Sequence, residues 1–385
     1  MPARSLPALR ALSLGAALVL ARPALAASDG ITVPLSTEGC PGARLGAPLV
    51  PFRDDVLVGV VGDGCNYVSL RDGRTGRERR RYTSPIQGAI GSSGGFGFAE
   101  AIAALRGLVL VGAPAEPAVH ALDAQSGRLV RTYAPPDTVS REGDFGTAIL
   151  GLGSRVIVGA RFDGVEVDEP RPYGTVHVFD AATGRLERSI PPPESPSARG
   201  FGVRLAALPR RRIAVGTIDA AAGRMGRVFV VDVRTGGVVT AITTAVPEGD
   251  FSGAFTTAGS RIIVGVPQAS GAPPGGIVQI YDATDGHLVR TLTSPGGASE
   301  AFGANVAARG RELLVVAPPA SLAPDQGATV YLFDLRMGRL TGRSDVSTAP
   351  VMLPTFLRRG FAYAVASGLG GPLELVYRYR LPPPP

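Results

Sequence analysis

The residues whose types could support metal binding or nucleophilic catalysis are few. His120 and His177 stand in two similar segments, "VHALD" and "VHVFD", and His287 follows the glycine of a turn. A zinc site needs several Cys or His residues at short spacings, which this chain lacks. We interpret His120 and His177 as two ordinary strand positions, not as metal ligands or an acid–base pair, and His287 as a solvated side chain.

The segment "GSSGG" at 91–95 matches the G-x-S-x-G pattern of hydrolases. A nucleophile elbow needs a strand before the serine and a helix after it, and no helical pattern follows here. The chain contains no lysine, which excludes a phosphate-binding loop of the P-loop type. The sequence therefore predicts no catalytic residue and a protein without enzymatic activity.

Carboxylates are concentrated in a few connecting segments. The segment "DGVEVDE" at 163–169 lies in the longest of them, 161–173, and the segment 135–144 is its neighbour. The candidate ligand-binding residues are Asp163, Glu166, Asp168, Glu169, Glu142 and Asp144. One hypothesis is an acidic face that attracts cations or a basic partner. The alternative is that acidic residues simply favour turns.

These segments belong to a repeat of about fifty residues, which positions them. Units begin near residues 45, 96, 145, 201, 251, 302 and 352, most of them at a phenylalanine–glycine step. A β-rich run such as "LVLVGA" follows, and then a third strand, a turn of the form Asp-x-x-x-Gly and a final strand. "FDAATGRL" at 179–186 is one copy of this turn.

The turn residues have a structural role in this interpretation. The aspartate can accept hydrogen bonds from following backbone N–H groups, and the glycine can adopt positive φ. These residues are Asp72, Asp123, Asp180, Asp232, Asp282 and Asp334, with Gly76, Gly127, Gly184, Gly236, Gly286 and Gly338.

Apolar residues alternate in the third strand of each unit, which indicates that one face is buried. The intervening position varies in type, so we expect the strand to pack mainly on one side. This position is occupied by Ser69, His120, His177, Phe229, Gln279 and Tyr331.

Seven units of four short strands are typical of a β-propeller. We therefore predict an all-β, seven-bladed propeller of four-stranded antiparallel blades. The last unit has strands near 352–357, 360–366 and 372–380 but lacks a fourth strand. We expect the N-terminal segment "ITVPL" at 31–35 to complete it and so to close the ring without an exposed edge.

Residues 1–26 have the pattern of an export signal, with Arg4 and Arg10, an apolar core and "ALA" at 24–26. We expect the remaining chain, 27–381, to form one propeller domain, followed by a proline-rich tail at 382–385. No cysteine stands beside the cleavage site and no later segment could span a membrane. We expect a periplasmic or extracellular monomer without a lipid anchor. In an oxidising compartment Cys40 and Cys65 predict one disulfide, with two free thiols as the alternative.

The Phe-Gly steps, "VGAP" at 111–114 and "VFDAATGRL" at 178–186 resemble FG-GAP repeats. This resemblance covers about residues 31–381 and implies the propeller of integrin α subunits and bacterial exported proteins. It also implies adhesion, or protein or glycan binding, often with calcium. The D-x-D-x-D-G calcium loop of that family is missing, and the segment nearest to it is "DGVEVDE" at 163–169. Calcium at Asp163 and Asp168 is therefore kept only as an alternative. The third strand is also similar to quinoprotein repeats, but the chain lacks their tryptophan.

These observations together predict an exported binding or scaffold propeller that recognises a protein or glycan through its loops, without a cofactor. A calcium-stabilised adhesion propeller is one alternative, and an enzyme with a quinoprotein-like or hydrolase site on the propeller axis is another. The net charge of +7 and the pI of about 9.9 come from arginine alone, and part of that charge lies in the signal. We therefore expect no nucleic-acid partner.

Overall fold

The computed structural model of the chain describes residues 33–34, 44–61, 66–85, 97–136, 143–164, 172–194, 198–218, 226–242, 254–267, 275–320, 328–346, 351–358, 361–367 and 375–380. The predicted signal and tail, together with Cys40 and Cys65, lie outside these residues. Within the described ranges, the secondary structure is β-strand apart from one 3₁₀ turn, η2 (Gly297–Ser299). None of the described residues forms a helix long and apolar enough to cross a bilayer.

Four-stranded antiparallel sheets, here called blades, follow one another along the chain. The first two blades consist of β2 (Arg44–Phe52), β3 (Asp55–Val61), β4 (Tyr67–Asp72), β5 (Glu78–Thr83), and of β6 (Ile102–Leu105), β7 (Leu108–Ala113), β8 (Ala118–Asp123), β9 (Leu129–Tyr133). The third and fourth consist of β10 (Phe145–Leu152), β11 (Arg155–Ala160), β12 (Thr175–Asp180), β13 (Leu186–Ile190), and of β14 (Arg204–Leu208), β15 (Arg212–Gly216), β16 (Val228–Asp232), β17 (Val238–Ile242). The fifth and sixth consist of β18 (Phe255–Ala258), β19 (Arg261–Val266), β20 (Ile277–Asp282), β21 (Leu288–Thr293), and of β22 (Asn305–Arg309), β23 (Glu312–Ala317), β24 (Ala328–Asp334), β25 (Arg339–Val346).

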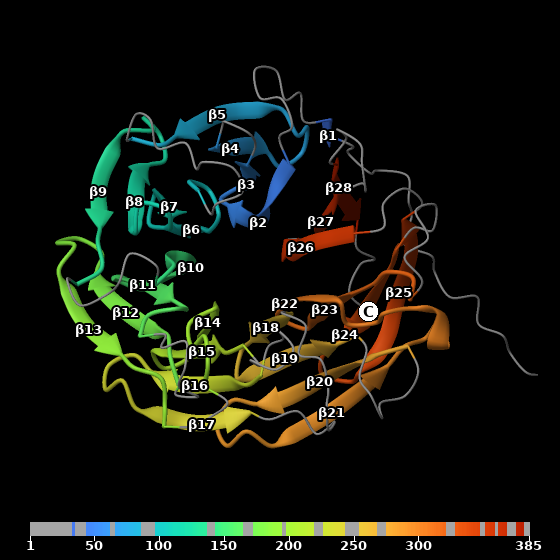
Figure 1. Ribbon diagram of the computed structural model, residues 1–385. Helices are drawn as coiled ribbons and strands as arrows, with labels where there is room; N and C mark the ends of the chain where they lie inside the picture. The colour runs from blue at the N-terminus through green and yellow to red at the C-terminus, as the bar shows by residue number, and fades with distance from the viewer. Residues whose placement is uncertain are drawn as a thin grey trace, which may run out of the picture.

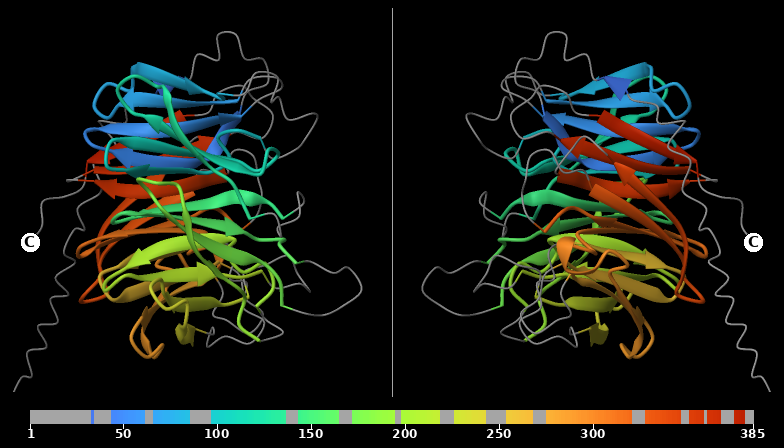
Figure 2. Two further views of the ribbon diagram at one scale, coloured as in Figure 1. Left: turned by 90° about the vertical axis from the view of Figure 1, so that its left-hand side faces the viewer. Right: turned by 90° about the vertical axis from the view of Figure 1, so that its right-hand side faces the viewer.

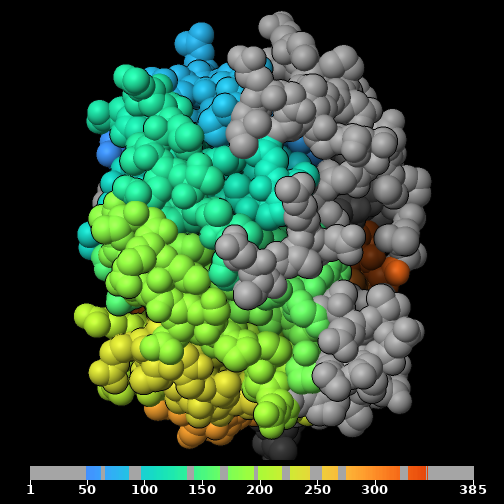
Figure 3. All heavy atoms as spheres, turned by 60° about the vertical axis from the view of Figure 1, so that its left-hand side comes forward, coloured from blue at the N-terminus to red at the C-terminus, as the bar shows by residue number. Residues whose placement is uncertain are grey.

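The sheets stand around a central axis with their first strands innermost, which makes the fold a β-propeller (Figure 1). Seen from the side, the strands run between two edges of the ring (Figure 2). Because the strands are antiparallel, both tight hairpins of a blade lie at one edge, which we call the hairpin edge. The connections between second and third strands, and between blades, lie at the other, the loop edge. The outer strands of the second to fourth blades form a continuous surface (Figure 3).

The prediction of a seven-bladed propeller is wrong. Six blades are built from four consecutive strands each, and the remaining sheet has the order β1-β28-β27-β26 and joins the two ends of the described chain. It contains β26 (Val351–Arg358), β27 (Phe361–Ser367), β28 (Leu375–Arg380) and β1 (Val33–Pro34). Of the N-terminal segment 31–35 that we expected to pair here, the structure describes Val33 and Pro34, which lie opposite Val376 and Leu375.

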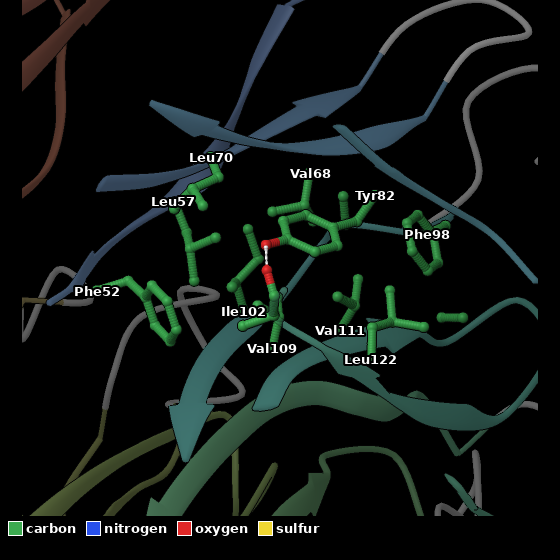
Figure 4. Packing of buried hydrophobic residues seen from close by; sticks show 13 residues of the cluster. Phe52, Leu57, Val68, Leu70, Tyr82, Phe98, Ile102, Val109, Val111 and Leu122 are labelled. Carbon is green, nitrogen blue, oxygen red and sulfur yellow. Dashed lines mark hydrogen bonds between the residues drawn. The ribbon is translucent and has the colours of Figure 1, made fainter. Parts of the chain in front are cut away.

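The hydrophobic cores lie between neighbouring blades and not within single sheets. One cluster joins Leu57 and Val68 of the first blade to Val109 and Val111 of the second (Figure 4). Equivalent clusters join the second blade to the third, the third to the fourth, the fourth to the fifth and the fifth to the sixth. Each of these blades is therefore covered by apolar side chains of its neighbours.

Burial on both faces corrects a second expectation. The variable position of the third strand was expected to be permissive, but all its side chains are buried. Their exposed fractions do not exceed 3% for Ser69, His120, His177, Phe229, Gln279 and Tyr331. The physical reason is that the third strand lies inside its sheet and has a neighbouring blade on each side.

The phenylalanine–glycine step has a packing function between blades. Phe145, Phe201 and Phe302 are fully buried, and the glycines that follow have φ of 97°, 99° and 93°. The carbonyl oxygen of each such glycine touches a second-strand glycine of the preceding blade, as Gly303 touches Gly265. A Cβ at Gly265 would overlap that oxygen. Glycine is therefore needed in the second strand of one blade and in the phenylalanine–glycine step of the next, because the two backbones approach closely there.

In the second blade the structure corrects the position of this step. The sequence suggested Phe96–Gly97, but Phe98 is the buried ring and Ala99 N donates to Gly112 O, the bond that Gly202 and Gly303 make elsewhere. Ala99 has φ of 78°, so an alanine adopts here the left-handed backbone conformation that favours glycine.

The repeated turns hold their predicted residues in one geometry. Asp72 Oδ1 accepts from the backbone N–H groups of Arg74 and Thr75 at 2.9 and 2.7 Å, and Asp180 accepts equivalently from Ala182 and Thr183. The Thr183 hydroxyl, which also donates to Asp180 Oδ1, and these backbone bonds hold the pKa of the Asp180 carboxyl below its usual value. The glycines at the ends of the turns have φ between 68° and 80°.

Outer strands fasten these turns to the preceding blade. The Tyr82 hydroxyl donates to Ala124 O at 2.8 Å, as the dashed line in Figure 4 shows, and Tyr133 donates to Ala181 O at 3.0 Å. Arg80 and Arg131 donate to Ser126 O and Thr183 O at 3.2 and 2.6 Å. Backbone carbonyl oxygens of these turns therefore accept hydrogen bonds from side chains of the preceding blade.

We expect Gly265→Ala to lower the free energy of unfolding by about 2–4 kcal/mol, because the added methyl group overlaps the backbone of Gly303 in the next blade. Gly237→Ala is the matched control, since its Cβ would meet only the Thr235 hydroxyl at 3.4 Å. Urea unfolding of both variants measures the difference. Equal stabilities would contradict the close approach of the two backbones.

The reverse change at Ala99 should stabilise the protein. Ala99→Gly removes a Cβ from a left-handed residue, and this strain is worth roughly 1 kcal/mol. The same measurement serves, with Ala103→Gly in strand β6 as the control, which should destabilise. A less stable Ala99→Gly variant would contradict the assignment of Phe98–Ala99 to the phenylalanine–glycine position.

Candidate functional site

An ion pair marks the loop edge of the third blade. Arg161 follows β11 and Asp144 precedes β10, and Arg161 Nε donates to Asp144 Oδ2 at 2.8 Å. The two side chains are 20% and 17% exposed. Asp144 has φ of 54°, a conformation rare for residues other than glycine. Its carbonyl accepts from the Thr147 hydroxyl at 3.0 Å, which helps to hold this conformation.

Two aromatic rings flank the same loop. Phe162 comes directly after Arg161, and Tyr173 lies just before β12, with their ring centroids 6.3 Å apart. The Arg161 guanidinium lies 4.7 Å from the centre of the Phe162 ring, close enough for a cation–π contact. Both aromatic side chains are half-buried. Arginine and tyrosine at a partly exposed rim are residue types enriched in protein interfaces.

Glu100 of the second blade extends this cluster. Burial raises the pKa of its carboxyl, while a backbone N–H of Gly97 and the charge of Arg161 act in the opposite direction. The charge of Asp144 adds to the upward shift. Glu100, Asp144 and Arg161 therefore influence one another across the seam between the second and third blades.

His120 and His177 lie beneath these loops, in β8 and β12. His120 Nδ1 lies 3.1 Å from the Thr132 hydroxyl, and its Nε2 lies 3.4 Å from Glu116 Oε2. His177 Nδ1 lies 3.0 Å from the Ser189 hydroxyl, but its buried Nε2 has no hydrogen-bond partner among the residues that the structure describes.

The difference between the two histidines follows from one methylene group. Glu116 and Asp163 occupy the same turn position, with their N–H groups bonded to Ala113 O and Ala160 O. The shorter aspartate makes no hydrogen bond to His177, although its charge opposes the effect of burial. Burial dominates and lowers the pKa of His177 to about 4.

Of the predicted ligand residues, Asp144 and Asp163 are placed at this loop edge. Glu142, Glu166, Asp168 and Glu169 lie outside the described residues, as do the "GSSGG" segment and the predicted disulfide. Among the described side chains, no group of three or more His, Cys, Asp or Glu is arranged to hold a metal ion. The calcium hypothesis at Asp163 and Asp168 therefore has no described set of ligands.

The axial strands carry no catalytic constellation that the described residues reveal. On β6, β10, β14, β18 and β22 the sequence has no carboxylate, imidazole or thiol. Arg204 of β14 stands on the innermost strand, and burial lowers the pKa of its guanidinium.

The sequence interpretation missed Phe162 and Tyr173 as members of this cluster. A signal was present, because an aromatic residue stands near each end of the longest connection, in "RFDG" at 161–164 and "RPYG" at 171–174. That the two rings meet depends on the pairing of β11 with β12, which brings the ends of the loop together.

The fold defines the class of the chain as a β-propeller, and solved structures agree. It is similar to BamB from Moraxella catarrhalis, with 14% identity, a TM-score of 0.50 and coverage of 87% of this chain and 85% of that one. Hydrazine synthase of Kuenenia stuttgartiensis has 16% identity, a TM-score of 0.59 and coverage of 87% and 96%. The WD40 domain of Neurospora crassa Pan2 has 12% identity, a TM-score of 0.58 and coverage of 94% and 98%.

At these identities the likeness shows the fold alone. No protein-family model and no curated protein sequence matches the chain. The propeller part of the FG-GAP resemblance thus agrees with the structural neighbours, and membership of that family stays a prediction.

The buried imidazole of His177 predicts acid sensitivity. Its pKa is about 4 in the folded chain and about 6.5 when unfolded, so the unfolded chain takes up the proton first as pH falls. Stability should decrease between pH 6.5 and pH 4, with His177 contributing up to about 3 kcal/mol. His177→Gln should flatten this dependence, measured by urea unfolding at several pH values.

Asp163→Glu is the companion variant. Its longer side chain can reach His177 Nε2, as Glu116 reaches His120, and should reduce the loss of stability at low pH without removing the histidine. If His177→Gln kept the full pH dependence, this account of the site would be wrong.

Proposed function

We propose that the chain is a non-enzymatic binding propeller that recognises a basic surface of a partner protein at the loop edge of its second and third blades. The observation that carries this proposal is the half-buried set of Arg161, Phe162 and Tyr173 beside the carboxylates of Asp144, Asp163 and Glu100. Aromatic and arginine side chains supply contact area, and the carboxylates supply charge complementarity.

The rigid frame under the loops supports this function. The strands that carry the cluster are packed on both faces, so the ends of β10, β11 and β12 are fixed relative to one another. Preorganised groups bind with a smaller entropic cost than groups on free segments. Adhesion of the FG-GAP kind and export to the periplasm or the outside of the cell belong to the same proposal. A glycan would meet the same aromatic rings, and the experiment below separates it from a protein.

The test replaces Tyr173 with a photo-crosslinking amino acid in the full chain and illuminates it with the proteins of the compartment that contains it. The same amino acid at Val130, an exposed residue of the outer strand β9, is the control. We expect a protein adduct from position 173 and none from position 130. Identical adducts from both positions, or adducts with glycans only, would contradict a protein partner.

The partner is then purified and titrated against Phe162→Ala/Tyr173→Ala, with Leu129→Ala as the control. We expect at least a tenfold rise in Kd for the double variant, because interface aromatics contribute more than about 1 kcal/mol each. Raising the salt from 0.05 to 0.5 M, roughly the range over which exposed charges become screened, should also weaken binding. If neither the double substitution nor the added salt changed Kd, the proposed site would be wrong.

A further inference from the structure

A pocket lined by arginines lies at the hairpin edge, between the fifth and sixth blades. Its volume is about 240 Å³. The lining residues are Ala258, Ser260, Arg261, Ile280, Val289, Arg290, Gly310, Arg311, Leu335 and Arg336. They come from the hairpins of both blades and from β20 and β21 of the fifth, so the pocket spans a seam of the ring at the edge opposite the loop site.

The positive charge of this pocket is only partly compensated. Arg261 pairs with Asp282, and Arg311 Nη2 lies 2.8 Å from Asp334 Oδ2. In the described part of the chain, Arg290 and Arg336 form no ion pair, and no carboxylate lines the pocket. Four guanidinium groups therefore face two neighbouring carboxylates, and these are also occupied by backbone N–H groups of their own turns.

At two other seams the equivalent arginine is hydrogen-bonded to the next blade. Arg80 and Arg131 occupy the position of Arg290 on their outer strands and donate to carbonyl oxygens of the next turn. Arg290 packs against Gly338 of the next turn, but within the described residues it makes no hydrogen bond to that turn. Its N–H groups are thus available to an acceptor in the pocket.

The other lining residues and the volume of the pocket indicate what the rest of the ligand must be like. Ile280, Leu335 and Ala258 supply an apolar surface, and the exposed Ser260 supplies a hydroxyl. The volume of about 240 Å³ leaves room for a small molecule. Guanidinium groups bind phosphate oxygens in a bidentate manner.

We propose that this pocket binds a small organic phosphate. Arg290 and Arg336 hold the phosphoryl oxygens, and the carbon skeleton rests on Ile280 and Leu335. The same chemistry is offered by a free phosphate ester and by the glycerophosphate headgroup of an anionic lipid. The pocket lies at a different edge of the ring from the loop site, so either proposal can fail without the other.

Isothermal titration of the full chain with glycerol 3-phosphate in dilute buffer tests the pocket. We expect saturable binding that weakens at least tenfold in Arg290→Ala/Arg336→Ala. Arg128→Ala/Arg185→Ala removes the same charge from exposed turns of the second and third blades and should bind as the unchanged chain does. Thermal unfolding of each variant checks that the fold is retained.

A second variant keeps every arginine in place. Ser260→Asp puts a carboxylate into the pocket and should abolish phosphate binding while leaving the melting temperature unchanged or higher. Vesicles of phosphatidylglycerol, compared with phosphatidylcholine, distinguish the sources: binding to the former at higher affinity than to glycerol 3-phosphate identifies the lipid headgroup, and the reverse identifies a free ester. Absence of binding to both probes would overturn the proposal, as would equal losses in the two double variants.

Discussion

The structure depends on one constraint: a four-stranded sheet of this sequence has apolar side chains on both faces and cannot cover either face by itself. Burial of apolar surface stabilises by about 25 cal/mol per Å², so an uncovered blade would lose most of its stabilisation. The cores therefore form between blades, and each blade depends on two neighbours. A ring satisfies this requirement for every blade, and the pairing of β1 with β28 brings the two ends of the chain into one sheet. The fold is thus a consequence of where the cores must lie.

The glycines of the phenylalanine–glycine step and of the second strand follow from the same constraint. Close packing of two sheets brings the backbone of Gly303 against Gly265, which leaves no room for a side chain. The repeated turns also join neighbouring blades, since each accepts a hydrogen bond from a tyrosine of the blade before it, Tyr82 or Tyr133. Motifs that look like local turn signals in the sequence are therefore contacts between blades.

Local features were predictable from the sequence and contacts between distant residues were not. The turn around Asp180 depends on a few adjacent residues, and their types indicate its geometry. The step at Phe98–Ala99 was misplaced by two residues because the phenylalanine–glycine pair Phe96–Gly97 precedes it. The bond from Ala99 N to Gly112 O and the burial of the Phe98 ring identify the true position. The two-sided burial of His177 was missed for a similar reason, because strand alternation reports the sheet's own face and not the blade packed on the other.

The buried third-strand position shows how the repeat accommodates polar residues within this close packing. Three blades use different pairs: Ser69 with Glu78, His120 with Glu116, and Tyr331 with Glu300 at 2.7, 3.4 and 2.8 Å. A buried polar group without a partner is costly, so a change of residue at this position requires a matching change nearby. His177 is the case where the match is incomplete, because Asp163 is one methylene group too short. The Nε2 of His177, unpaired among the described residues, lies beneath the loop that carries Arg161 and Phe162. The stability of the third blade and the shape of the proposed binding edge are therefore linked at this imidazole.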